Sequence, residues 1–63
     1  MDINEINDHI DALSDVSNLR GTTMADVING RTVTYDPRVD RYRINGTGGR
    51  WATRDATSAR LLG

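Results

Sequence analysis

The spacing of apolar residues changes from a helical to an extended period along this chain, and that change limits the folds it can adopt. Between residues 3 and 13 aliphatic side chains recur every three or four positions, at Ile3, Ile6, Ile10 and Leu13, and the pattern continues through Val16 or Ser17 toward Leu19. This spacing draws one apolar stripe on a helix. From residue 31 the period falls to two, in "RTVTY" and again in "RYRI", which predicts antiparallel strands buried on one side.

The ends of the first helix are also marked in the sequence. Asp2 can cap the helix, and Glu5 occupies the third helical position of a capping box. Gly21 follows Arg20 and is expected to end the helix, because glycine readily adopts the left-handed conformation of a C-terminal cap.

The stretch "TTMADVING", residues 22–30, fits two structures. Thr23 and Asp26 resemble a second helix start with Gly30 as its terminal glycine, whereas Asn29-Gly30 is also a two-residue hairpin turn between two strands. We favour the short helix, with Met24, Val27 and Ile28 packed under the first helix. The hairpin remains the alternative.

The rest of the chain supplies turns, strands and a last helix. Asp36-Pro37 favours a turn, "NGTGG" predicts a second one, and "RWAT" would form a third strand. The tail "DATSARLL" is expected to be helical, capped by Thr53 or Asp55 and closing the core with Leu61 and Leu62. The predicted fold is therefore α+β: an N-terminal amphipathic helix packed on a two- or three-stranded antiparallel meander, with a short C-terminal helix, in one small domain of residues 1–63.

The strand alternation assigns side chains to two faces of the predicted sheet. The buried face collects Val33, Tyr35, Tyr42, Ile44 and Trp51, and the opposite face collects Thr32, Thr34, Arg41, Arg43, Arg50 and Arg54. Neighbouring arginines repel one another unless something neutralises them. Three interpretations stay open for Arg41, Arg43, Arg50 and Arg54: a solvated face, a face that binds an acidic protein surface such as the first helix of another copy, or a face that binds nucleic acid.

Charge is divided between the two halves of the chain. Residues 1–30 hold six acids and one arginine, for a net charge of −5, and residues 31–63 hold seven arginines and three acids, for +4. Charges separated in this way can be satisfied inside one molecule, between copies, or by a charged ligand.

The residues that several classes of function require are missing from this sequence. The chain has no cysteine and one histidine, which argues against a zinc site, and "GTGGR" does not match a phosphate-binding loop. We therefore predict no cofactor, no metal and no catalytic residues. The first residues are acidic and no long apolar run follows, so we expect no membrane partner and a location in the cytoplasm or inside an assembly.

Residues 41–62 resemble a segment of tailed-phage virion and head-morphogenesis proteins. The resemblance lies in Tyr42, Arg43, Thr47, Gly48, Arg50, Trp51 and Thr53, with one additional glycine before Arg50. It covers about a third of the chain and implies a role in structure or assembly, with a location within a virion as the alternative to the cytoplasm.

These observations favour a non-enzymatic protein–protein interaction module. We expect a minor structural or accessory subunit of a phage-like assembly, which associates with itself or with a larger particle. The alternative is a small regulator or inhibitor, which would bind nucleic acid or block a host protein through mimicry by the acidic helix.

Overall fold

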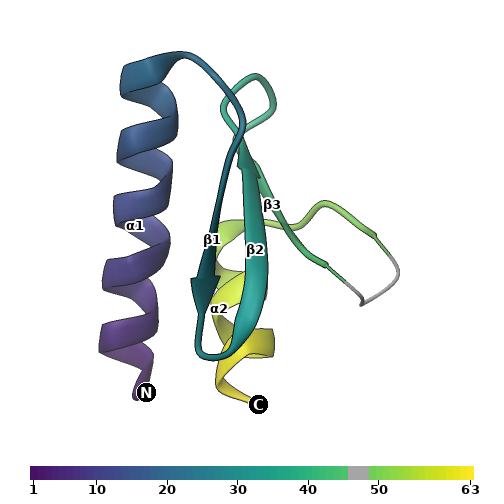
Figure 1. The fold of residues 1–63 in the computed structure, drawn as a ribbon. Coiled ribbons are helices and arrows are strands. Elements are labelled where there is room, and N and C mark those ends of the chain that lie inside the picture. Colours follow the sequence, from purple (N-terminus) through teal and green to yellow (C-terminus); the bar gives the residue numbers. More distant parts are fainter. Residues whose placement is uncertain (46–48) are drawn as a thin grey trace.

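The chain folds into two layers, with one sheet and two helices (Figure 1). A computed structural model describes residues 1–45 and 49–63. The elements follow one another as α1 (Ile3–Arg20), β1 (Met24–Ile28), β2 (Arg31–Asp36), β3 (Arg41–Ile44) and α2 (Arg54–Leu62). The α+β prediction with a helix at each end and an antiparallel meander between them is confirmed.

Both ends of α1 follow the sequence signals. The Asp2 carboxylate accepts a hydrogen bond from the backbone N–H of Glu5 at 2.9 Å, which caps the first turn. Gly21 has φ 70° and its N–H binds the carbonyls of Ser17 and Asn18. The helix therefore ends where a left-handed residue becomes available.

The preferred helix over residues 22–30 is wrong, and the hairpin alternative is correct. β1 pairs antiparallel with β2, from Met24 opposite Tyr35 to Ile28 opposite Arg31. Asn29 and Gly30 connect them with φ 50° and 79°, the two positive values that this kind of tight hairpin turn requires. Because a strand alternates its side chains, Ile28 is buried while Val27 is 62% exposed, so the expectation that Val27 packs under α1 is also wrong.

The sheet has the order β1-β2-β3, so its third strand is β1 and not "RWAT". From that predicted strand only Ala52 pairs, through two backbone hydrogen bonds with Tyr42 of 2.8 and 2.7 Å. The turn predicted for "NGTGG" falls largely on residues 46–48, which lie outside the described residues.

At the edge of the sheet, β1 has one backbone group bound locally. The N–H of Val27 donates to the Asp26 carboxylate at 2.8 Å. This N–H is therefore engaged within the strand itself.

The hairpin turn also holds the C-terminal end of α2. The Asn29 amide donates to the carbonyl of Leu61 at 2.8 Å, and Arg31 donates to the carbonyl of Arg60 at 3.4 Å. These bonds satisfy carbonyls that the last turn of a helix leaves without partners. Thr53 caps the other end of α2, where its hydroxyl accepts from the N–H of Ala56.

The core lies between the sheet and the two helices, which both cover the same side of it. Its members are aliphatic except for two tyrosines: Ile6, Ile10, Leu13, Ile28, Val33, Tyr35, Tyr42, Ile44 and Leu61. The predicted burial of Val33, Tyr35, Tyr42 and Ile44 is confirmed. Leu62, expected to join Leu61, is 51% exposed, because consecutive helical residues point about 100° apart.

Candidate interaction surface

The side of the sheet that faces away from both helices forms the candidate surface. Pairing brings Ala25, Thr34 and Arg43 into one row across the three strands. Val27 lies opposite Thr32, and Arg41 lies opposite Asp36, so the alternation places these residues on the same side. We call this the outer sheet face, made of Ala25, Val27, Thr32, Thr34, Asp36, Arg41, Arg43 and Trp51.

Trp51 belongs to this face and not to the core, which corrects the sequence-based assignment. Ala52 is half-buried and pairs with Tyr42, whose side chain points to the core. Trp51, one residue earlier, therefore points the other way. Its ring centre lies 4.9 Å from the guanidinium carbon of Arg43, and the side chain is 41% exposed. Such a cation–π contact fixes the orientation of both groups.

The four arginines proposed as binding residues lie in three places: on β3, in the segment before Trp51, and at the start of α2. Arg41 and Arg43 lie on the outer sheet face, and Arg50 is exposed in the segment that leads to Trp51. Arg41 donates to the carbonyl of Asp40 at 2.9 Å. Arg54 does not join them, because it begins α2 and binds α1.

Arg54 connects the two helices through a bidentate ion pair. Its Nε and Nη2 atoms donate to the two carboxylate oxygens of Asp11 at 2.7 and 2.9 Å, and Nη1 donates to Asp55 at 3.2 Å. The hydrogen bonds from Arg54 hold the pKa of Asp11 below its ordinary value of 3.8. The same contacts raise the pKa of Arg54. This arginine is thus committed to holding the helices together.

Asp36 is likewise engaged by an arginine. Its carboxylate accepts from Nε and Nη2 of Arg38 at 3.1 and 2.9 Å, and from the N–H of Arg38 at 2.9 Å. These bonds lower the pKa of Asp36. Asp40, the other acid of this turn, accepts from the hydroxyl of Tyr35 at 2.6 Å. Both carboxylates therefore serve the turn.

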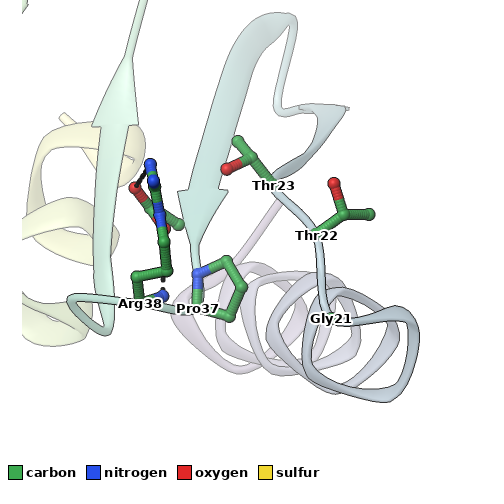
Figure 2. A pocket seen from close by; sticks show the side chains of 6 residues that line it. Gly21, Thr22, Thr23, Pro37 and Arg38 are labelled. Atoms are coloured by element: carbon green, nitrogen blue, oxygen red, sulfur yellow. Dashed lines mark hydrogen bonds and ion pairs between the residues drawn. The ribbon is translucent and has the colours of Figure 1, made fainter.

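An open hollow of about 310 Å³ lies at this end of the molecule. Figure 2 shows Thr22 and Thr23 along one wall and Pro37 with Arg38 along the other. Because Arg38 is bound to Asp36, the hollow presents a compensated pair of charges. A second depression, of about 250 Å³, runs between α1 and β1 and is lined mainly by apolar side chains, among them Leu13, Val16 and Met24.

Within residues 1–45 and 49–63, no group of three or more histidine, aspartate or glutamate side chains is arranged to hold a metal ion. His9 is exposed on α1. No helix in the described part of the chain is long and apolar enough to cross a membrane.

Comparisons with known proteins find no relative of this chain. No protein-family model matches the chain, and neither the curated proteins nor the solved structures give a match. The geometry of the outer sheet face is therefore the basis for assigning a function.

Proposed function

We propose that this chain is a non-enzymatic protein–protein interaction module that binds through its outer sheet face. The supporting observation is that one side of a three-stranded sheet carries Trp51 stacked with Arg43 beside β3, and an exposed Val27 on β1 at the other edge. Sheets in small domains ordinarily bury one face and solvate the other with polar residues. A tryptophan and an arginine on the solvated face are the residue types that dominate binding energy at protein interfaces.

The charge of this face defines the chemistry of the partner. Arg41 and Arg43 project from β3, while Asp36, the carboxylate that pairs with Arg41 in the register, is bound by Arg38. The face is thus positive in spite of the overall net charge of −1. A partner would offer carboxylates to the arginines and an apolar patch to Trp51 and Val27.

In this proposal the chain acts as a minor structural or accessory subunit of a larger assembly. The acidic α1 and the basic outer sheet face let one copy contact neighbours of either charge. The phage-like character of that assembly rests on the resemblance of residues 41–62 alone, and Thr47 and Gly48 of that segment lie outside the described residues.

Nucleic acid is a second candidate partner, favoured by the exposure of Trp51. Proteins that bind single strands combine basic side chains with aromatic rings on which bases stack. If all aromatic rings lay in the core, none could stack with a base. Trp51 lies outside the core beside Arg43, so one ring is available for stacking.

Photo-crosslinking in the cells that make the protein separates these candidates. Val27→p-benzoylphenylalanine places a reactive group on the outer sheet face, and the matched control Leu62→p-benzoylphenylalanine places it on exposed α2. We expect protein crosslinks from position 27 that position 62 does not give, and that Arg41→Glu with Arg43→Glu removes. Crosslinks to nucleic acid, or the same products from both positions, would refute the protein-binding proposal.

A further inference from the structure

The solvent side of α1 carries a pattern that complements the outer sheet face. The buried residues of α1 are Ile6, Ile10, Leu13 and Ser17. At 100° per residue, the opposite side of the helix presents Asp8, Ala12, Asp15 and Leu19, all of them exposed. We call these four residues the α1 stripe. It alternates carboxylates with apolar side chains. Leu19 is 88% exposed, so its expected place on the buried apolar stripe of this helix is wrong.

The two surfaces match in charge and in spacing. Asp8 and Asp15 are seven helical residues apart, about 10 Å along the axis, and Arg41 and Arg43 are two strand residues apart, about 7 Å. Arginine side chains are long enough to absorb a difference of about 3 Å and to bind carboxylates bidentately.

The apolar members can meet in the same arrangement. Leu19, four residues beyond Asp15, would face Trp51, which stacks on Arg43 at the same edge of the sheet, and both side chains are exposed. Laying a helix across an open sheet is also the ordinary way in which a sheet face is covered.

These surfaces do not bind each other within one molecule. Asp8, Asp15 and Leu19 are exposed on the side of α1 opposite its buried residues, whereas the outer sheet face is the side of the sheet that neither helix covers. At their margins, Ala12 and Ala25 both line the depression between α1 and β1. Among the described residues, α1 forms an ion pair with an arginine through Asp11, which binds Arg54. Neither residue belongs to the two surfaces.

From this complementarity, which rests on the proposed function, we propose that the partner of the outer sheet face is a second copy of this chain, bound through its α1 stripe. The contact joins two different surfaces, so each copy keeps one surface available for a further neighbour. Association is head-to-tail and continues beyond the dimer.

The size of the sheet sets the strength of this contact. Three strands about 5 Å apart and about five residues long offer on the order of 300 Å² per copy, against about 800 Å² per partner in a stable complex. Association is therefore weak, grows steadily with protein concentration, and declines as salt screens the ion pairs.

Sedimentation velocity on the purified chain tests the proposal, with concentrations up to about 1 mM and NaCl from about 20 mM to about 0.5 M. We expect the mean sedimentation coefficient to rise with concentration at low salt and to return to the monomer value at high salt. A wild-type protein that is monomeric throughout, or one that stops at a dimer, would overturn the proposal.

Charge reversal identifies the surfaces involved. We expect the double variant Asp8→Arg/Asp15→Arg to be monomeric when measured by itself. We expect the same of the double variant Arg41→Glu/Arg43→Glu. An equimolar mixture of the two double variants should associate again, because each reversed surface meets a complementary one. Far-ultraviolet circular dichroism verifies that both are folded.

A matched control excludes an effect of net charge. Arg20→Glu with Arg60→Glu changes the net charge by the same amount as the pair on β3, at exposed residues that belong to neither surface. It should associate like the wild type, and its failure to do so would overturn the assignment of surfaces.

Binding of a fluorescent single-stranded oligothymidine tests the nucleic-acid candidate. A monomeric wild-type protein that binds this probe through Arg41 and Arg43 would overturn the second copy as partner and favour the nucleic-acid candidate. If the protein is monomeric but is crosslinked through position 27 to a different protein in cells, the second-copy inference fails while the interaction module stands.

Discussion

Replacement of Asn29 tests the hairpin that the sequence left undecided. Asn29→Ala removes the hydrogen bond to the carbonyl of Leu61 and leaves alanine at a φ of 50°. The lost hydrogen bond is worth about 1 kcal/mol, and the left-handed conformation of alanine costs about 1 kcal/mol more. Asn29→Gly loses only the first contribution, because glycine adopts positive φ without steric cost. We therefore expect about 2 kcal/mol of destabilisation for alanine and about 1 kcal/mol for glycine.

Urea denaturation followed by circular dichroism at 222 nm measures both effects. A domain of 63 residues has a free energy of unfolding of about 3–9 kcal/mol, so a loss of 2 kcal/mol is a large shift of the midpoint. A helix over residues 22–30 would give the opposite sign, because alanine is the best helix former and glycine among the worst. Stabilisation by Asn29→Ala, or an equal cost for both variants, would refute the reasoning.

Two further predictions concern the ion pair between the helices and the last turn of α2. Because Arg54 holds the pKa of Asp11 below 3.8 in the folded state, this carboxylate adds stability above its unfolded pKa, and the contribution is lost as pH falls through the folded value. The free energy of unfolding, measured by urea denaturation from pH 6 to pH 3, should therefore decline less in Asp11→Asn than in the wild type. The difference should be under about 1 kcal/mol because the pair is solvated; equal declines would contradict this role. Leu61→Ala, at a side chain 2% exposed, should cost about 2–5 kcal/mol of unfolding free energy, and Leu62→Ala, at a side chain 51% exposed, under about 0.5 kcal/mol. Similar thermal midpoints for the two leucine variants would show that α2 does not dock as described.

Local signals in the sequence were sufficient for α1 and for the β2–β3 pair. The apolar period of α1 extends over several turns and is closed by Asp2 and Gly21, so propensity, pattern and caps agree. The strand pair is similarly defined, since Tyr35 and Tyr42 alternate with polar residues and meet across the pair. In both cases the residues that form an element lie close together in the sequence.

Residues 22–30 were assigned wrongly because the same letters satisfy two local rules. Asn29-Gly30 serves a helix end and a hairpin turn equally well. The decision depends on long-range contacts: β1 pairs with β2, and the Asn29 side chain binds Leu61, which lies 32 residues away. A pattern read along the chain does not contain that contact.

The candidate surface was predicted in part for a similar reason. Alternation placed Arg41 and Arg43 correctly on one face, because they belong to a paired strand. Alternation along the predicted strand "RWAT" places Trp51 in the core, whereas pairing through Ala52 turns it outward beside Arg43. Arg54 was added to the face by extending the strand, whereas the cap at Thr53 begins a helix there and directs Arg54 to Asp11.

The hydrogen bond from the N–H of Val27 to the Asp26 carboxylate has a consequence for how the protein resists aggregation. β1 is an edge strand, and exposed edges recruit strands from other chains through unpaired backbone groups. The carboxylate occupies one of these donors at 2.8 Å and adds a charge at the same place. Growth of the sheet into a fibril is thereby opposed at the strand where it would begin.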